Sequence, residues 1–472
     1  MRYHGPDSLQ KGVFQLTKKR HNNSPISKNQ LIDLTITGLS HEGNGVGRYG
    51  DMVVFVSMAA PGDALRVKIV KVLSTHAFAI IHAILTPSTH RIADDCPVYS
   101  RCGGCSLRHL SYDAEITVKS GWVTDNLRRI GGVVLPMDAP LPSPHSARYR
   151  NKAQYPIRRV NGRLCAGFFA RRSHALVPVT DCLLQPAIFS AITAAFLSFL
   201  ESHDIEPYDE ADHSGLIRHL YLRRAGATGQ VMVCIVVNGA AVPHEEALVA
   251  ALLAAYPDIA TVVLNTNRRR DNVILGDHQR NLYGNGTISD ILCGVKVTLS
   301  PASFYQVNRE AAENLYQKAL EYADPGPDDI LLDLYCGTGT IGLSMAARVG
   351  HLIGVELAGS AVRDARLNAA QNGVANAAFI EADAGDVLSV AGERPTIVVL
   401  DPPRKGVDKG TLEAVAAMGP KKIVYISCNS ATLARDCAIL AALGYKAVKA
   451  GAVDMFPRTA HVEAVALLEQ VL

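Results

Sequence analysis

The chain has 472 residues, 48% of them hydrophobic and 19% charged, which excludes a largely disordered protein and predicts about three globular domains. Lys and Arg outnumber Asp and Glu only by 47 to 44, so the overall charge does not by itself indicate a nucleic-acid partner. No stretch is apolar for long enough to cross a bilayer and Met1 does not begin a secretory signal, so we expect a cytoplasmic protein.

The first 28 residues are polar and show no periodic apolar pattern. Asp7 is their only acidic residue, and it stands against several lysines and arginines. We expect residues 1–28 to form a disordered basic tail, which either solubilises the protein or makes nonspecific contacts with phosphates.

Residues 29–87 contain short β-rich runs separated by glycine-rich turns, which predicts a small closed barrel. The runs lie at 31–37, 52–56, 64–72 and 78–84. Gly38, the loop at 42–47 and the segment Val67-Lys68-Ile69 resemble the TRAM domain, a relative of the oligonucleotide-binding fold. This resemblance implies RNA binding, with a purely structural role as the alternative.

Three of the ten cysteines stand close together, because Cys96, Cys102 and Cys105 have the spacing C-x5-C-x2-C. The other cysteines are mostly isolated in apolar runs, so a disulfide scaffold is not expected. Zinc knuckles more often come as two close pairs, whereas three near cysteines plus a remote one suit a four-iron cluster. An iron–sulfur cluster is therefore favoured, with zinc or no metal as the alternative.

Residues 88–300 are expected to form a central α+β domain that carries the cysteines and binds RNA. Its pattern is mixed and β-rich from 148 to 299, with apolar helical stretches at 186–200 and 245–255. Basic residues interleaved with aromatics suit phosphates and unstacked bases. They lie at 148–152, 158–159 and 171–172, where a solvated basic face is the alternative.

In residues 301–472 strands alternate with helices from about Asp329 onward, which predicts a doubly wound parallel sheet of the Rossmann-like α/β type. The expected strands lie at 330–332, 351–355, 377–380, 397–400 and 422–426.

The loop after the first of these strands has the pattern G-x-G-x-x-G, which fits a dinucleotide as well as S-adenosylmethionine. Asp333, just before the glycines, would be a poor neighbour for a pyrophosphate, whereas the sulfonium and ammonium of S-adenosylmethionine favour negative charge. Glu356 ends the second strand and can accept hydrogen bonds from ribose hydroxyls, and Asp383 lies just past the third, within reach of the adenine edge. Glu356 fits either ligand, so both readings stay open at this point.

Two polar segments, 401–404 and 427–430, follow the next two strands, where open α/β sheets bind their ligands. A nicotinamide enzyme has no evident use for Cys428, whereas methylation of uracil needs a cysteine of this kind. Carbon 5 of uracil is a weak nucleophile, so a thiolate must first add to carbon 6, and a base must later remove the carbon 5 proton. Cys428 is the expected nucleophile. Glu463, at the start of a final apolar strand, is the expected base, while Cys336 and Cys437 are treated as packing residues.

Together with 303–308 and 457–463, these segments resemble in order the RNA uracil-5-methyltransferase family, particularly its ribosomal branch with a TRAM domain and an iron–sulfur cluster. The resemblance covers residues from about 30 to the end. It implies Cys428 as nucleophile and Glu463 as proton-abstracting base. It also implies residues at or near the methyl donor, namely Gln306, Tyr335, Thr340, Glu356, Asp383 and Asp401.

The same resemblance implies that Phe304 stacks on the uracil and that Asp401 also contacts it. Thr340 departs from the family, in which this position is often Asn. For the cluster, the resemblance implies Cys182 as the fourth ligand, with Cys165 as the alternative.

The sequence therefore predicts a multidomain protein with an N-terminal TRAM-like barrel, a central α+β domain with an iron–sulfur cluster and a C-terminal methyltransferase domain. We expect a monomer that methylates 23S ribosomal RNA, with transfer RNA as the alternative substrate, on a uridine that is flipped out or single-stranded. The alternatives from other classes are a dinucleotide-dependent iron–sulfur oxidoreductase and a noncatalytic RNA-binding protein.

Overall fold

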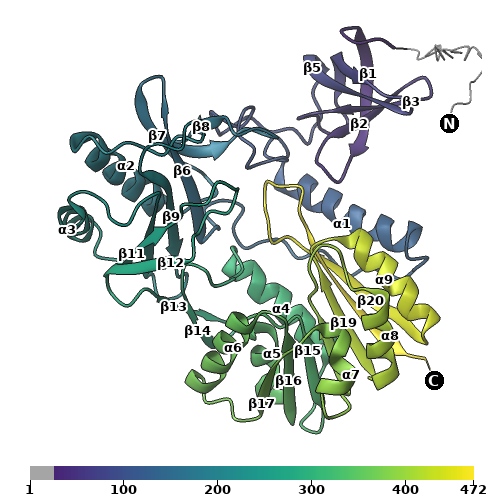
Figure 1. The fold of residues 1–472 in the computed structure, drawn as a ribbon. Coiled ribbons are helices and arrows are strands. Elements are labelled where there is room, and N and C mark those ends of the chain that lie inside the picture. The colour runs from purple at the N-terminus through teal and green to yellow at the C-terminus, as the bar shows by residue number, and fades with distance from the viewer. Residues whose placement is uncertain (1–25, 472) are drawn as a thin grey trace, which may run out of the picture. The chain divides into compact units, whose positions relative to one another are not determined.

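The computed structural model describes residues 26–471, so most of the predicted basic tail lies outside the described residues. The chain forms two compact units (Figure 1). The described residues up to Gly38, together with Gly45–Ser88, make the first unit, and Leu39–Asn44 with the residues from Thr89 onward make the second.

The first unit is a closed barrel in the strand order β1-β2-β3-β5-β4, which confirms the predicted small barrel. Every second residue of β1 is buried, at Ile32, Leu34 and Ile36, as expected for a strand with one face in a core. A Cβ on Gly47 would lie 2.5 Å from Cδ1 of Leu34, so glycine allows β2 to approach the barrel interior. The strands are β1 (Leu31–Leu39), β2 (Gly45–Tyr49), β3 (Met52–Val56), β4 (Ala64–Val72) and β5 (His76–Thr86).

The second unit contains a mixed sheet in the order β12-β11-β10-β9-β6-β7-β8 and a separate hairpin, β13-β14. Helices α2 (Ala187–Ser202) and α3 (Glu245–Ala255) match the predicted helical stretches, and their apolar residues share one core with this sheet. The strands are β6 (Lys152–Val160), β7 (Arg163–Phe169), β8 (Leu176–Pro178), β9 (Ile217–Arg224), β10 (Val231–Val237), β11 (Ile259–Thr266), β12 (His278–Tyr283), β13 (Ile288–Leu292) and β14 (Val295–Leu299).

The C-terminal sheet of the second unit has the order β17-β16-β15-β18-β19-β21-β20. Its five predicted strands are present and parallel, and the last two strands form a hairpin in which β21 is antiparallel to both neighbours. The strands are β15 (Ile330–Leu334), β16 (His351–Glu356), β17 (Ala377–Glu381), β18 (Ile397–Leu400), β19 (Lys422–Ser427), β20 (Tyr445–Val453) and β21 (Glu463–Gln470).

Helices cover both faces of this sheet (Figure 1). The α-helices are α4 (Arg309–Ala323), α5 (Thr340–Met345), α6 (Gly359–Gln371), α7 (Val387–Val390), α8 (Lys409–Met418) and α9 (Ser430–Ala442). Two short 3-10 helices are η1 (Ala346–Arg348) and η2 (Ala384–Asp386). This arrangement is the predicted doubly wound fold, and it brings the carboxyl ends of the parallel strands to one edge.

Helix α1 (Tyr112–Arg129) has no counterpart among the predicted elements. Its buried face includes Glu115 and Lys119 as well as Trp122, so charged residues interrupt the apolar periodicity that would have revealed the helix. Although α1 belongs to the residues expected for the central domain, it packs on α9 and β20 of the C-terminal sheet.

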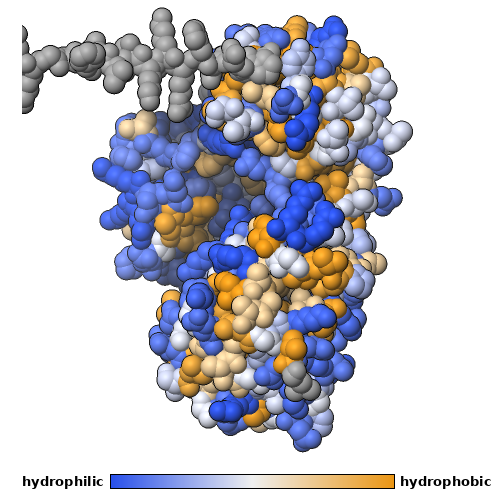
Figure 2. Space-filling view, turned by 90° about the vertical axis from the view of Figure 1, so that its right-hand side faces the viewer, coloured by the Kyte–Doolittle hydropathy of each residue, from blue (hydrophilic) through white to orange (hydrophobic). Residues whose placement is uncertain are grey.

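The surface seen in Figure 2 carries small groups of hydrophobic residues separated by hydrophilic ones. Among residues 26–471, no helix has the length and apolar character needed to span a membrane.

Candidate active site

Residues predicted to act in catalysis meet at the carboxyl edge of the C-terminal sheet. Strands β15, β16, β18 and β19 pair in parallel register, so they end side by side. Strand β21 runs the opposite way, with Ala464 opposite Ser427. The next register position therefore places Glu463 beside Cys428. The other predicted site residues that directly follow or end these strands are Tyr335, Glu356 and Asp401.

Asp333 anchors the glycine loop from inside the protein. It is fully buried, and its Oδ2 accepts a hydrogen bond from the Gly342 N–H at 2.8 Å. A Cβ on Gly342 would lie 2.9 Å from that oxygen, so the close approach requires glycine. Burial raises the pKa of Asp333 to about 7, and its Oδ1 has no hydrogen-bond partner among the described residues. A cationic ligand would favour the ionised form of this carboxyl and satisfy it.

Tyr335 and Glu356 are both held in fixed positions beside the loop. The backbone of Tyr335 has a φ of 64°, a strained value for a bulky residue and one that is found most often at functional sites. Burial raises the pKa of its hydroxyl to about 12. Glu356 accepts hydrogen bonds from the N–H groups of Gly337 at 3.2 Å and Ala358 at 2.8 Å. Both carboxylate oxygens of Glu356 are thus oriented at the end of β16.

Thr340 and Asp383 have local partners as well. The Thr340 hydroxyl, in the first residue of α5, lies 3.3 Å from the hydroxyl of Tyr316. Asp383 is exposed after β17, and it caps η2 by accepting a hydrogen bond from the Gly385 N–H at 2.8 Å. Asp401 is partly buried after β18, and burial raises its pKa to about 7.

Cys428 and Glu463 form a charged group with Asp401 and Arg404. Burial raises the pKa of the Cys428 thiol, and the negative charge of Glu463 raises it further, whereas Arg404 lowers it. Burial likewise raises the pKa of Glu463 to about 8, with Asp401 raising it and Arg404 lowering it. Within the described chain, no hydrogen bond or ion pair reaches the Glu463 carboxyl. The group therefore combines a thiol, a nearly neutral buried acid and a nearby guanidinium.

Phe304 lies on the loop 303–308, whose backbone is tied to the central sheet. Asn151 donates from its side chain to the Gln306 carbonyl and from its backbone to the Val307 carbonyl, both at 2.8 Å. Phe304 itself is 69% exposed, an unusual position for a large apolar side chain with no partner surface. In the part of the chain that the structure describes, no hydrogen bond links the Gln306 side chain to the carboxyl edge.

Comparisons with known proteins match this architecture. The family model described as tRNA (Uracil-5-)-methyltransferase covers residues 295–471, and that of the TRAM domain covers 27–81. An uncharacterized RNA methyltransferase of Clostridium tetani is 39% identical over 94% of this chain and 97% of its own length. Another, from Listeria monocytogenes, is 41% identical over 94% of this chain and 99% of its own. This chain belongs to the RNA uracil-5-methyltransferase family.

A solved structure supports the same assignment for this methyltransferase. The Pyrococcus abyssi tRNA (uracil-54, C5)-methyltransferase in complex with S-adenosyl-L-homocysteine matches it with a TM-score of 0.76 and 27% identity. The match covers 93% of this chain and 100% of that one. The ligand named for that protein, S-adenosyl-L-homocysteine, is the demethylated form of the methyl donor expected here. The dinucleotide oxidoreductase alternative has no support.

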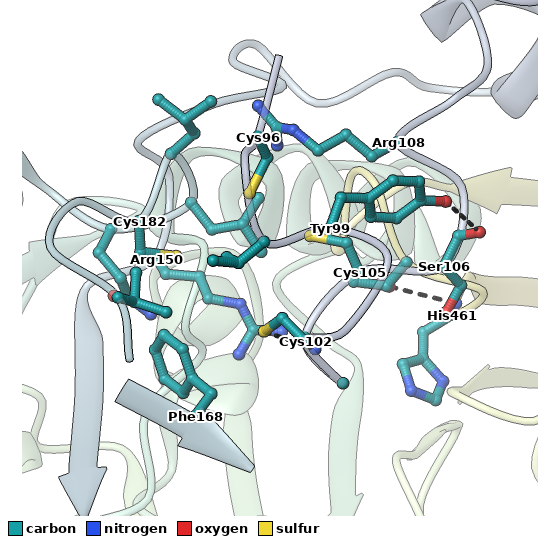
Figure 3. A pocket seen from close by; sticks show the side chains of 18 residues that line it. Cys96, Tyr99, Cys102, Cys105, Ser106, Arg108, Arg150, Phe168, Cys182 and His461 are labelled. Atoms are coloured by element: carbon teal, nitrogen blue, oxygen red, sulfur yellow. Dashed lines mark hydrogen bonds between the residues drawn. The ribbon is translucent and has the colours of Figure 1, made fainter. Parts of the chain in front are cut away.

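A cavity of about 310 Å³ in the methyltransferase has four cysteines among its lining residues (Figure 3). Three come from the loop before α1 and the fourth from the segment between β8 and α2; they are Cys96, Cys102, Cys105 and Cys182. Burial raises the pKa of Cys105 to about 12, and the other three thiols add to this increase because they lie nearby. Cys165, the alternative fourth ligand, lies on β7 and does not line the cavity.

The spacing of these thiols distinguishes two kinds of metal site. A single zinc ion needs every sulfur about 2.3 Å from one point, and no three His, Cys, Asp or Glu side chains between residues 26 and 471 come close enough for that. In a four-iron cluster each cysteine binds a different iron, so the sulfurs stand further apart. The described residues therefore show no ligand set for a single metal ion, and the iron–sulfur cluster stays a prediction.

Most of the predicted RNA-contacting arginines are neutralised within the protein. Arg158 pairs with Glu210 at 2.5 Å, Arg159 with Glu206 at 2.8 Å, and Arg148 with Asp181 at 2.6 Å. Exposed pairs of this kind add little stability, but they reduce the charge that is available to phosphates.

Unneutralised positive charge instead faces a second cavity, of about 120 Å³. Arg150 and Arg224 both line it, Arg150 also lines the cysteine cavity, and among the described residues neither arginine forms an ion pair. The buried Nε of Arg150 has no hydrogen-bond partner within residues 26–471. Burial and the charges of Arg223 and Arg150 lower the pKa of the nearby Lys152 to about 8. This local excess of positive charge suits an anionic ligand.

Sequence reasoning gave no role to three residues that the structure brings to these sites. Arg404 lies in the segment 401–404 after β18, and Cys428 lies in the segment after β19. The common place of these two segments could have indicated a role for Arg404. Arg224 ends β9 without any motif, and Lys119 lies on the helix that was not predicted. Their places depend on contacts between segments that are far apart in the chain.

Proposed function

We propose that this methyltransferase methylates carbon 5 of a uridine in 23S ribosomal RNA through a transient bond between Cys428 and carbon 6 of the ring. The proposal rests mainly on one observation, that β19 and β21 bring Cys428 and Glu463 to neighbouring register positions. S-adenosylmethionine, when bound, supplies the methyl group.

Cys428 starts the reaction as a thiolate. Its sulfur forms a bond to carbon 6, and the electrons of the carbon 5–carbon 6 double bond move toward the carbonyl at position 4, giving an enolate. Carbon 5 would then form its bond to the methyl group with the enolate electrons, while the bond from that methyl group to the sulfur of the donor breaks and the sulfur keeps its electron pair. The guanidinium of Arg404 supports the first step because it lowers the pKa of Cys428 against the effect of burial.

Glu463 completes the reaction as the base. Its carboxylate takes the proton from carbon 5, the electrons of that C–H bond re-form the ring double bond, and the carbon 6–sulfur bond breaks to return the Cys428 thiolate. A base with a pKa of about 8 is well matched to work near neutral pH, because it takes a proton readily yet is partly ionised.

The residues around the glycine loop would hold the methyl donor. The unpartnered oxygen of Asp333 and the buried carboxyl of Asp401 suit its positive charge, and Glu356 stands where ribose hydroxyls could donate to it. Tyr335, Thr340, Asp383 and Gln306 complete the proposed donor site. The exposed ring of Phe304 offers a surface on which a flipped uracil could stack.

Cys96, Cys102, Cys105 and Cys182 are proposed to bind a [4Fe-4S] cluster. This assignment is supported by the cavity that the four cysteines share. The cluster would supply a covalent link between two distant segments, since the methylation itself needs no electron transfer.

Transfer RNA is the second candidate substrate. The Pyrococcus abyssi protein with a TM-score of 0.76 acts, by its name, on uracil 54 of tRNA. Its match over 93% of this chain supports transfer RNA as the alternative substrate. Ribosomal RNA is favoured because the TRAM domain together with the cysteine cluster resembles the ribosomal branch.

The direct test uses a labelled methyl donor with 23S ribosomal RNA and transfer RNA in separate reactions, followed by mapping of the product. We expect 5-methyluridine in the ribosomal RNA. Cys428→Ala should abolish it, whereas Cys165→Ala, outside both sites, should not. Glu463→Gln should accumulate protein covalently bound to RNA, because the carbon 5 proton can no longer be removed. Full turnover by Cys428→Ala would refute the mechanism, and label in tRNA alone would refute the ribosomal substrate.

A further inference from the structure

The segment 454–462, here called the strap, joins the end of β20 to Glu463 at the start of β21. Antiparallel neighbours are usually joined by loops of about 2–5 residues, and the strap is longer and has no helix or strand of its own. Glu463 pairs with Val453 in the sheet and follows the strap directly, so the sheet and the strap together hold its backbone.

The first attachment of the strap is a buried ion network on α1. Nζ of Lys119 lies 2.7 Å from a carboxylate oxygen of Glu115, 2.7 Å from one of Asp454, and donates to the Phe456 carbonyl at 3.1 Å. The other oxygen of Asp454 accepts from the Tyr112 hydroxyl at 2.9 Å. Burying these charges has a high free-energy cost, and the closing of a hairpin does not require it.

The second attachment is the loop before α1 that carries Cys96, Cys102 and Cys105, here called the cysteine loop. The backbone N–H groups of Ser106 and Leu107 donate to the carbonyl of Arg458 at 2.8 and 3.0 Å. The N–H of Arg458 donates to Glu115 at 2.7 Å, and its guanidinium donates to the Leu110 carbonyl at 2.9 Å. Arg458 has a φ of 69°, so these contacts hold it in a strained conformation.

The strap also forms part of the cysteine cavity. Thr459 and His461 line it together with the four cysteines (Figure 3). The strap therefore contacts the cysteine loop at Arg458, lines the cavity at His461 and is followed directly by Glu463.

We propose that the strap is a positioning element through which α1 and the cysteine loop hold Glu463 in place for removal of the carbon 5 proton. This inference rests on the proposed function. Addition of Cys428 to carbon 6 and transfer of the methyl group do not need Glu463, whereas proton removal needs its carboxylate within hydrogen-bond reach. Loosening the strap therefore slows the last step and leaves the first two unchanged.

The test replaces Arg458 and follows the two halves of the reaction separately. Arg458→Gly removes the side-chain contacts and tolerates the left-handed backbone, and Arg458→Lys keeps the positive charge. Asn161→Gly is the matched control, because Asn161 also has a positive φ of 51° but lies in an exposed turn between β6 and β7. Each protein is mixed with S-adenosylmethionine and an RNA that contains the target uridine, or the same RNA with 5-fluorouridine at that position.

With 5-fluorouridine the first half of the reaction is isolated. Carbon 5 then carries fluorine and the new methyl group and has no proton for a base to take, so the bond to Cys428 persists. Arg458→Gly should form this adduct at the wild-type rate. With ordinary uridine it should turn over roughly 10-fold more slowly or worse and accumulate the covalent adduct on denaturing gels. The turnover rate of Arg458→Lys should be closer to the wild-type rate than that of Arg458→Gly. The rate of Asn161→Gly should equal the wild-type rate.

A second measurement keeps the cysteine loop in the test. Hydrogen exchange of the backbone amides in 454–462 should rise in Arg458→Gly and also in Cys102→Ser, in which the cysteine loop loses one of its proposed ligands. Equal slowing with both RNAs, or no slowing at all, would overturn the positioning role, and so would unchanged exchange. Failure of the wild-type protein to form an adduct with the fluorinated RNA would instead refute the proposed mechanism.

Discussion

Burial raises the pKa of three carboxyl groups at the carboxyl edge of the C-terminal sheet. The pKa is raised to about 7 for Asp333 and Asp401 and to about 8 for Glu463. Ionised carboxylates in such a setting need a positive partner. A methyl donor with a sulfonium and an ammonium group would provide one, so donor binding and ionisation of the two aspartates should be coupled.

This coupling predicts tighter donor binding as pH rises from 5.5 to 7. A bound cation favours the ionised carboxylates, so below their pKa a proton must be released on binding, which costs about 1.4 kcal/mol per pH unit and per group. The dissociation constant of S-adenosylmethionine, measured by calorimetry, should therefore fall by up to about tenfold per pH unit for each group in this range. Asp333→Asn should weaken binding and flatten the dependence. A dissociation constant that does not vary with pH in the wild-type protein would contradict the coupling between donor binding and ionisation of the two aspartates.

At the scale of the elements, the ends of β6 and β9 place positive charge at the second cavity. If Arg224 contacts an RNA phosphate there, Arg224→Gln should weaken RNA binding and reduce the slope of log affinity against log salt by about 0.7–0.9. The matched control is Arg159→Gln, because Arg159 is already paired with Glu206 and Glu201. Affinity measured by filter binding at several salt concentrations checks this. Equal slopes for the two variants would exclude Arg224 as a phosphate contact.

Helix α1 depends on its buried ion network for stability. Lys119→Met should lower the free energy of unfolding by about 3–5 kcal/mol, because the variant leaves Asp454 buried without a cation and leaves Glu115 with only the guanidinium of Arg458, 3.6 Å away. Arg128→Met, on the same helix in an exposed pair with Asp125, should change it by less than about 1 kcal/mol. Urea denaturation measures both values. A small effect of Lys119→Met would mean that water reaches the network.

At the scale of the whole molecule, the cysteine cavity joins segments that are far apart in sequence. Cys182→Ser should reduce the iron content, bleach the visible absorption of a cluster and lower the melting temperature, because the link between the cysteine loop and the segment before α2 is lost. Cys165→Ser, on β7 and outside the cavity, should change none of these. Purification without oxygen followed by iron and sulfide analysis provides the readout. Full iron content in Cys182→Ser would reassign the fourth ligand.

Local patterns in the sequence were enough to predict most of the regular structure. Four of the five barrel strands, α2, α3 and the five parallel strands follow from alternation, apolar runs and glycine-rich turns, which are properties of neighbouring residues. Strand β2 was not predicted, because it begins inside the glycine-rich loop at 42–47. The polar residues after the parallel strands could be predicted to meet, because parallel neighbours end at the same edge. The nucleophile, the base and the methyl donor were therefore expected from the sequence alone.

Other features were decided only by tertiary contacts. Helix α1 escaped prediction because Lys119 and Glu115 are buried through pairing with each other and with Asp454, which is remote in sequence. The antiparallel direction of β21 places Glu463 beside Cys428, and the cavity includes Cys182 and leaves out Cys165. Charge pairing and the spacing of thiols act between distant segments, so no local pattern records them, and only the folded chain determines which arginines are free and how the base is held.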